Sequence, residues 1–191
     1  MTSYSAIVVG ASAGGVEALL QIFAALPAGF EIPILTVLHL PDERRSQLSE
    51  VFAMRLRREV REAGDKQAIE PGIIYVAGPG YHLSVERDFT LSLSQEDRVH
   101  FSRPAIDMLF DSAADAYGPQ LVGVLLTGAN EDGAQGLATI KRRGGLTIIQ
   151  DPAQAKVAIM PLAALKLQQP DHILSLNGIG SLLATLERSQ C

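Results

Sequence analysis

The stretch Ser5-Ala-Ile-Val-Val-Gly-Ala-Ser-Ala-Gly-Gly15 decides the fold class. Residues 5–9 are a short, mostly apolar run with β-branched side chains, which is typical of a strand buried on both faces. Glycines then allow a tight turn, and residues 16–26 carry apolar side chains at three- and four-residue spacing, which predicts a helix ended by Pro27 and Gly29. The stretch therefore predicts a strand, a glycine-rich turn and a helix.

The same alternation continues along the chain. Further buried strands are predicted at 33–38, 73–77, 121–126, 146–149 and 173–174, and helices at 46–58, 104–116 with a proline near its first turn, 132–141, 162–167 and up to about 186. Residues 82–85 and 89–93 alternate apolar and polar side chains around a turn and predict a β-hairpin. Alternating strands and helices imply parallel strands with right-handed crossovers. We therefore expect an α/β fold: a doubly wound, mainly parallel, Rossmann-like sheet with helices on both faces, plus a small β-hairpin.

Length, charge and composition narrow the class of protein. The 191 residues fit one domain, 1–191, and the net charge of −5 does not suggest a nucleic-acid binder. The richest basic stretch, residues 55–58, is interpreted as a solvated helix face. The one cysteine, Cys191, permits no disulfide within the chain and is interpreted as incidental. We see no secretory signal and no apolar run of the ~18 residues that a membrane span needs. The expected location is cytoplasmic, without membrane insertion.

In a parallel sheet the residues that follow the strands build the site. Ser12 stands in Gly10-Ala11-Ser12-Ala13-Gly14, a Gly-x-Ser-x-Gly turn that can present a serine nucleophile at the top of the sheet. A dinucleotide-binding turn would have glycine at Ser12 and an acidic residue after the second strand, where this chain has His39. Ser12 as a plain helix N-cap is the third reading, and the motif alone does not separate them.

His39 and Asp132 follow two further strands. A serine hydroxyl needs a base to accept its proton, and a histidine one strand away could serve, although a strand-end histidine often only binds a loop carbonyl. Asp132 could hold the imidazole in the productive tautomer, or it could merely start a helix; Glu131 is the alternative partner. No metal-ligand motif is found, so neither a metal nor a cofactor is expected. Ser12, His39 and Asp132 are the predicted catalytic triad.

Taken together, these segments make the chain resemble the catalytic domain of the chemotaxis receptor protein-glutamate methylesterase/glutamine deamidase family. The resemblance covers nearly the whole chain. The segments that carry it occur in family order: Gly10 to Gly15, Val37 to Pro41, Pro71 to Ala77, Arg103 to Phe110, Leu125 to Ala134 and Met160 to Ala164.

The resemblance implies the chemistry residue by residue. Ser12 would attack a receptor γ-glutamyl methyl ester, His39 would carry the proton to methanol and Asp132 would orient His39. The backbone amides of Ala129 and Ala13 would bind the oxyanion, and a γ-amide would be deamidated by the same machinery. The implied partners are the cytoplasmic helices of methyl-accepting chemoreceptors.

The sequence departs from the family pattern at four points. Ala13 replaces a frequent threonine, Asn130 a usual glycine, and Ser102 a histidine before the Arg-Pro pair, with His100 two residues earlier. Family members commonly carry an N-terminal receiver domain, and none is expected in this chain. Two alternatives stay open: another serine esterase or amidase on this scaffold, or a non-enzymatic nucleotide- or receptor-binding module. Residues 42–46 are a candidate receptor-binding loop by proximity.

Overall fold

The computed structural model describes residues 3–40 and 47–186, and the described strands form one central sheet and one hairpin. The central sheet has seven strands in the order β3-β4-β2-β1-β7-β8-β9, and every neighbouring pair is parallel. The strands are β1 Ala6–Ala11, β2 Ile34–Leu38, β3 Val60–Glu62, β4 Ile74–Val76, β7 Leu121–Leu125, β8 Leu146–Gln150 and β9 His172–Leu174. The predicted α/β class is confirmed.

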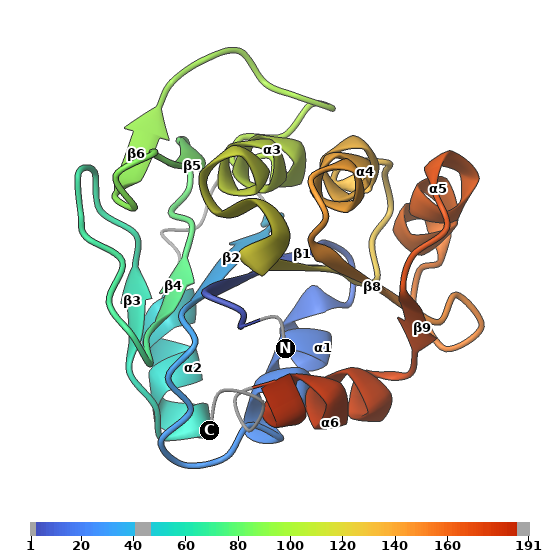
Figure 1. Cartoon of the computed structure of the whole chain (residues 1–191), viewed down its shortest axis with the longest axis horizontal. Helices are drawn as coiled ribbons and strands as arrows, with labels where there is room; N and C mark the ends of the chain where they lie inside the picture. The colour runs from blue at the N-terminus through green and yellow to red at the C-terminus, as the bar shows by residue number, and fades with distance from the viewer. Residues whose placement is uncertain (1–2, 41–46, 187–191) are drawn as a thin grey trace.

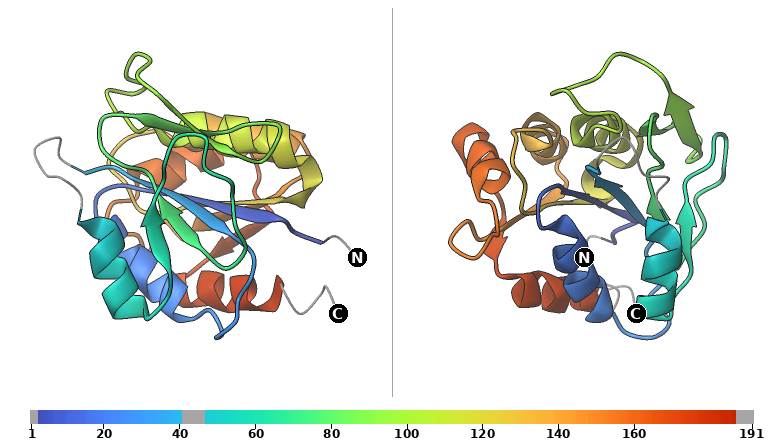
Figure 2. Two further views of the ribbon diagram at one scale, coloured as in Figure 1. Left: turned by 90° about the vertical axis from the view of Figure 1, so that its left-hand side faces the viewer. Right: turned by 180° about the vertical axis from the view of Figure 1, so that it is seen from behind.

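Helices cover both faces of the sheet (Figure 1). One layer holds α3 Ile106–Tyr117, α4 Ala134–Arg142 and α5 Ile159–Leu167, and the other holds α1 Gly15–Ala24, α2 Leu48–Leu56 and α6 Leu176–Leu186. A single 3₁₀ turn, η1 Gly118–Gln120, links α3 to β7. Figure 2 shows the same two layers from the side and from behind. The chain is therefore doubly wound, as predicted.

The core is divided by the sheet into two apolar layers. Successive side chains of β1 point to opposite faces, so Ala6 and Val8 join one layer while Ile7 and Val9 join the other. Phe110 on α3 is fully buried in the first layer. Phe23 and Phe52 meet edge to face in the second, with ring centroids 6.5 Å apart. Burial on both faces explains why the strands show no polar alternation.

The hairpin packs on the α3 side of the molecule. It consists of β5 His82–Val85 and β6 Leu91–Ser94, which pair antiparallel as predicted. The Val85 amide donates a hydrogen bond of 3.0 Å to Ser112 Oγ on α3. The buried His82 ring joins two further segments, because its Nε2 contacts the Asp97 carbonyl at 3.0 Å and its Nδ1 accepts from the Ala105 amide at 3.1 Å. The hairpin thus braces the start of α3.

Several predicted boundaries were wrong, for local reasons. The helix expected at 104 begins at Ile106, because Ala105 is an extended N-cap. The helix expected at 132 begins at Ala134, because Gly133 is the N-cap in the left-handed region at φ 92°. The helix expected at 162 begins at Ile159. The edge strand β3 was missed, since it has only three residues and none of them is buried.

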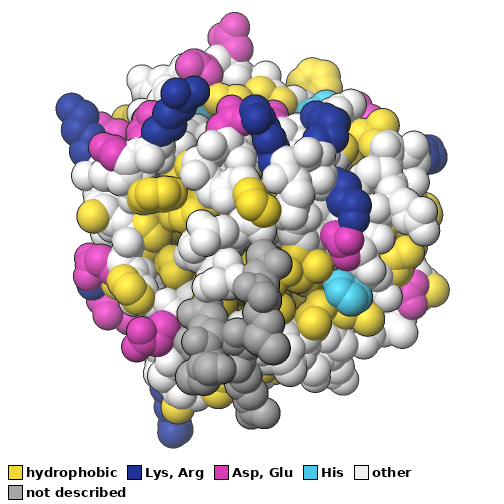
Figure 3. All heavy atoms as spheres, in the orientation of Figure 1, with side chains coloured by type: hydrophobic (Ala, Val, Ile, Leu, Met, Phe, Trp, Pro, Cys, Tyr) yellow, Lys and Arg dark blue, Asp and Glu magenta, His cyan; other side chains and the backbone are white. Residues whose placement is uncertain are grey.

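Charged side chains of both signs are interspersed on the face shown in Figure 3. The basic stretch at 55–58 is only partly a helix face, since α2 ends at Leu56 and Arg57 is its left-handed C-cap. Arg58 instead donates a hydrogen bond of 2.7 Å to the Leu26 carbonyl and ties α2 to the end of α1. Within residues 3–40 and 47–186, no helix is long and apolar enough to cross a bilayer. Cys191 lies outside the described residues.

Phe110 should be a stability determinant of the α3 layer. Phe110→Ala removes a fully buried ring from a packed core and should lower the free energy of unfolding by about 3–5 kcal/mol. Phe101→Ala is the matched control because that ring is 95% exposed, so its cost should stay within about 0.5 kcal/mol. Urea unfolding followed by circular dichroism would measure both. Equal losses in the two variants would contradict this description of the core.

Candidate active site

Strand register brings the three predicted segments together at the carboxyl edge of the sheet. Pairing of β1 with β2 ends at Ala11 opposite Leu38, so the next residues, Ser12 and His39, leave neighbouring strands side by side. The His39 amide donates to the Ala11 carbonyl at 3.1 Å, and the Ser12 amide donates to the Thr127 carbonyl, on the segment after β7, at 3.0 Å. The ends of β2, β1 and β7 therefore form one site, as expected for a parallel sheet.

The turn that carries Ser12 is tightly packed. Gly14 has φ 80°, which favours glycine, and a Cβ on Gly15 would lie 2.4 Å from Leu38 Cδ1. Thr127 supports the turn from the neighbouring strand end: its Oγ1 donates to the Ala13 carbonyl at 2.8 Å and accepts from the Val157 amide at 2.9 Å. These contacts fix the backbone around Ser12. The sequence did not single out Thr127, although this residue lies within the segment Leu125 to Ala134.

His39 and Asp132 form a buried pair. His39 Nε2 lies 2.8 Å from Asp132 Oδ2, with the histidine side chain 11% exposed and the aspartate fully buried. Because Nε2 faces Asp132, Nδ1 is the ring nitrogen left to face a nucleophile. Among the described contacts of Ser12 there is no hydrogen bond to this ring; such bonds commonly tighten only in the substrate complex.

Glu131, the alternative partner of the histidine, points elsewhere. Its side chain is 70% exposed, and its Oε1 lies 3.6 Å from His100 Nδ1. The geometry therefore favours Asp132 as the residue that orients His39. The interpretation of His39 as a histidine that binds a loop carbonyl does not describe this ring, because its hydrogen-bond partner among the described residues is a carboxylate.

The start of α3 holds the Asp132 carboxylate. Its Oδ2 accepts the Ile106 amide at 2.6 Å, and its Oδ1 accepts the Asp107 amide at 2.9 Å. Amides in the first turn of a helix lack helical partners, and the helix dipole there favours a negative charge. Asp132 thus serves as the cap of α3 while it also contacts His39. This second role was not apparent in the sequence.

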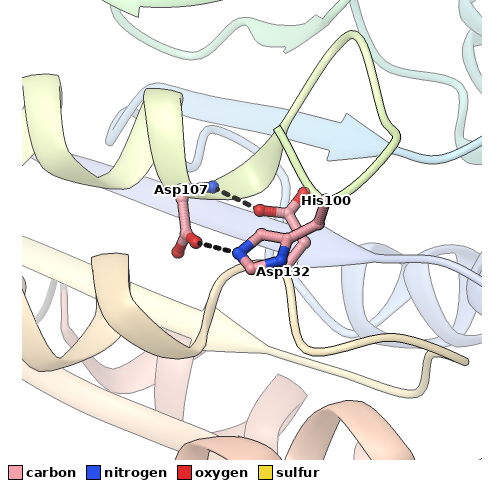
Figure 4. A group of neighbouring side chains, drawn as sticks. All are labelled: His100, Asp107 and Asp132. Carbon is pink, nitrogen blue, oxygen red and sulfur yellow. Dashed lines mark hydrogen bonds and ion pairs between the residues drawn. The ribbon is translucent and has the colours of Figure 1, made fainter. Parts of the chain in front are cut away.

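Asp107 makes the reciprocal contact. Its Oδ1 accepts the amides of Gly133 and Gly136, at the start of α4, at 3.0 Å and 2.7 Å. Its Oδ2 lies 3.2 Å from His100 Nε2, and Figure 4 shows the Asp107 amide directed at Asp132 and its carboxylate at His100. Sequence reasoning missed this residue, which stands in the first turn of a predicted helix without any motif of its own.

The environment of Asp107 raises the pKa of its carboxyl group to about 6. Burial is the largest cause, and the negative charges of Asp132 and Asp111 act in the same direction. The hydrogen bond from the Gly136 amide and the charge of His100 oppose the rise. Asp107 therefore titrates at a higher pH than an ordinary aspartate.

His100, Asp107 and Asp132 offer ligand atoms within 4.8 Å of one another, a spacing that could suit a metal ion. However, both oxygens of Asp132 and one of Asp107 already accept backbone N–H groups. Only Asp107 Oδ2 and a ring nitrogen of His100 remain, which is a poor ligand set. The expectation of no metal and no cofactor stays a prediction from the sequence.

A pocket of about 170 Å³ opens beside His39. Two arginines give it positive charge, and both brace its wall: Arg98 donates to the Phe101 carbonyl at 3.3 Å and Arg103 to the Glu96 carbonyl at 3.0 Å. The lining residues are His39, Leu40, Arg98, Phe101, Ser102, Arg103 and Pro104. A substrate group bound here would lie next to the imidazole.

Two backbone amides, one after β1 and one after β7, are the oxyanion donors expected from the sequence. Among the described hydrogen bonds, none uses the amide of Ala13 or of Ala129 as a donor. Their neighbours are engaged, since the Gly128 amide donates to Val157 and the Ser12 amide to Thr127. Amides of this kind can stabilise developing negative charge on a carbonyl oxygen.

The fold and this site define a doubly wound α/β protein whose polar site lies beyond three adjacent parallel strands. Residues 7–183 match the family profile described as CheB methylesterase, so the chain belongs to the CheB methylesterase family.

Known relatives agree with this assignment. A Leptospira interrogans protein named for protein-glutamate methylesterase/protein-glutamine glutaminase activity is 44% identical over 187 residues, which is 98% of this chain and 97% of the relative. The Myxococcus xanthus protein-glutamate methylesterase FrzG is 36% identical over 94% of this chain, which spans 54% of FrzG. The crystal structure of the Thermotoga maritima CheB methylesterase catalytic domain superposes with a TM-score of 0.91 at 30% identity, covering 96% of this chain and 99% of that one.

The raised pKa of Asp107 should make stability depend on pH between about 4 and 6. The folded protein keeps this proton to a higher pH than the unfolded chain, so the contribution of Asp107 to the unfolding free energy falls as pH rises through this window and is constant above it. Asp107→Asn lacks this titration. The stability difference, wild type minus variant, should therefore decrease across the window by at most about 2–3 kcal/mol. Denaturant unfolding at several pH values measures it; a difference that increases would contradict the assignment.

Proposed function

We propose that this protein is a serine hydrolase that removes methyl esters from protein γ-glutamyl side chains. The observation that carries the proposal is the buried His39–Asp132 pair, set beside the Ser12 turn by the register of β1 and β2. Family membership supports the substrate class, because relatives carry the name protein-glutamate methylesterase. In this proposal Ser12 is the nucleophile, His39 the base and Asp132 the residue that orients the base.

The reaction proceeds in two steps. Ser12 Oγ attacks the ester carbonyl while His39 Nδ1 accepts the hydroxyl proton, and collapse of the tetrahedral intermediate releases methanol with that proton. Water then attacks the glutamyl-serine ester, with His39 again acting as base, and frees the glutamate carboxylate and Ser12. Asp132 keeps Nε2 protonated and stabilises the imidazolium that forms in each step.

The amides of Ala13 and Ala129 are the proposed oxyanion donors. Both belong to turns that follow adjacent strands, and both lack an acceptor among the described hydrogen bonds. Because the proposed donors are main-chain groups, the identity of the side chain at Ala129 or Ala13 does not remove either amide.

The same machinery would accept a γ-amide and release ammonia, which supports a second activity as a glutamine deamidase. Relatives named for both activities point the same way. The proposed partners are cytoplasmic helices of chemoreceptors, and the proposed location is the cytoplasm. The candidate receptor-binding loop at 42–46 lies outside the described residues.

The first test is methanol release from a methylated chemoreceptor fragment. Ser12→Ala and His39→Ala should each lower the rate at least ~10³-fold, as removal of a triad member does. Ser92→Ala, a serine on the hairpin strand β6, is the matched control and should leave the rate unchanged.

Two results would change the conclusion. Unchanged release by Ser12→Ala would disprove the nucleophile assignment. Release from small activated esters but none from the receptor fragment would favour another serine esterase or amidase on this scaffold, the alternative kept from the sequence.

The oxyanion assignment has its own test. Ala129→Pro removes the amide hydrogen and should lower kcat about 10²–10³-fold, whereas Ala129→Gly keeps the amide and should stay within severalfold of wild type. Near-UV circular dichroism checks that both variants are folded. Similar kcat values for the two folded variants would remove Ala129 from the oxyanion site.

A further inference from the structure

Asp107 touches the catalytic aspartate from two sides. Its amide donates to Asp132 Oδ1 at 2.9 Å, and its carboxylate accepts the amide of Gly133, the residue after Asp132, at 3.0 Å. The Asp132 side chain and the peptide that follows it are thus both fixed to one residue. Any rotation of Asp132 away from His39 would have to break contacts with Asp107.

The residues around this contact are closely packed. Gly133 has φ 92°, and a Cβ there would lie 2.5 Å from Leu125 Cδ1 and 2.7 Å from Ile106 Cγ2. A second hydrogen bond, from the Gly136 amide, holds the Asp107 carboxylate at 2.7 Å. The hydrogen bonds to Asp107 therefore hold the segment before α4 in closely packed surroundings.

Capping alone does not require a charge at this position, since asparagine or serine would also accept these amides. Asp107 nevertheless places a second carboxylate, 7% exposed, beside the fully buried Asp132. That carboxylate adds negative charge beside the aspartate that contacts His39. Asp107 thus contributes to the His39–Asp132 pair in two ways that substitutions can separate: through its hydrogen bonds and through its charge.

Charged or titratable groups on the elements around Asp107 influence the ionisation of its carboxyl group. Asp132 faces it from the turn before α4, Asp111 lies one turn further along α3, and His100 lies 3.2 Å away on the segment before α3. Glu131 in turn lies 3.6 Å from His100, and Lys166 of α5 lines the same pocket as these two residues. His100 is the only one of these groups within ion-pair distance of Asp107 among the described residues.

We infer that Asp107 is a positioning residue for the His39–Asp132 pair: its hydrogen bonds hold Asp132 in place, and its carboxylate adds negative charge beside the pair. The inference rests on the proposed function for its effect on rate, but its effect on His39 is measurable without any substrate. His100 is the side chain within ion-pair distance of the Asp107 carboxylate among the described residues.

Two substitutions separate geometry from charge. Asp107→Asn keeps an oxygen for the Gly133 and Gly136 amides and loses the charge, while Asp107→Ala loses both. Asp115→Asn is the matched control, because it removes the same charge from an exposed site two turns further along α3. Imidazole signals of the four histidines would be followed by ¹H–¹⁵N NMR titration, with the His39 signal identified by its loss in His39→Gln.

The His39 midpoint should fall by roughly 0.5–1 pH unit in Asp107→Asn and not in Asp115→Asn. The acid limb of kcat/KM on the methylated receptor fragment should move to lower pH by the same amount. Asp107→Ala should lower kcat more than 10-fold with little change in KM, and Asp107→Asn should recover most of that loss.

A His39 midpoint that moves no further in Asp107→Asn than in Asp115→Asn would overturn the charge role. A folded Asp107→Ala with wild-type kcat would overturn the positioning role. Failure of the proposed function is distinguishable from both, since it appears as unchanged activity in Ser12→Ala, whereas the NMR titration does not depend on activity.

Discussion

The site depends on reciprocal hydrogen bonding between the starts of two helices, α3 and α4. α3 and α4 begin at the same edge of the sheet, and each has unpaired amides in its first turn. Asp132, just before α4, accepts the first amides of α3, and Asp107, in the first turn of α3, accepts the first amides of α4. Each carboxylate thus satisfies donors of the other helix. Two negative charges are tolerated inside the protein because two helix dipoles and several N–H groups converge on them.

This reciprocal hydrogen bonding requires the backbone to lie close to the surrounding side chains. Ile106 lies against both Gly10 of β1 and Gly133, where an added Cβ would come within 2.4 Å and 2.7 Å of Ile106 Cγ2. The same isoleucine donates its amide to Asp132. Packing and hydrogen bonding therefore both position the Asp132 carboxylate. The register of β2 against β1 then places His39, the residue after β2, in contact with that carboxylate.

The sequence predicted the parallel sheet, its two helical layers and the hairpin, because buried strands and amphipathic helices have different apolar periods. Ser12, His39 and Asp132 were singled out because strand ends converge in such a sheet, and the structure places His39 and Asp132 in contact. Their catalytic roles stay predictions. Asp107 and Thr127 were missed because their partners are backbone groups from segments distant in the chain, which no local pattern records. Helix starts were misplaced where a glycine or an extended residue, rather than a side-chain cap, ends the loop.

The order of the strands has a consequence for how the site is assembled. β1 precedes the other strands in the chain, and one of its two neighbours, β7, begins only at Leu121. Thr127, which follows β7, makes the hydrogen bonds that hold the Ser12 turn. Contacts between segments so far apart in the chain form slowly, because the entropy of closing a long loop must be overcome first. During synthesis the serine therefore emerges long before the backbone that supports it. We therefore expect the Ser12 turn to become fixed only when the second half of the sheet has docked.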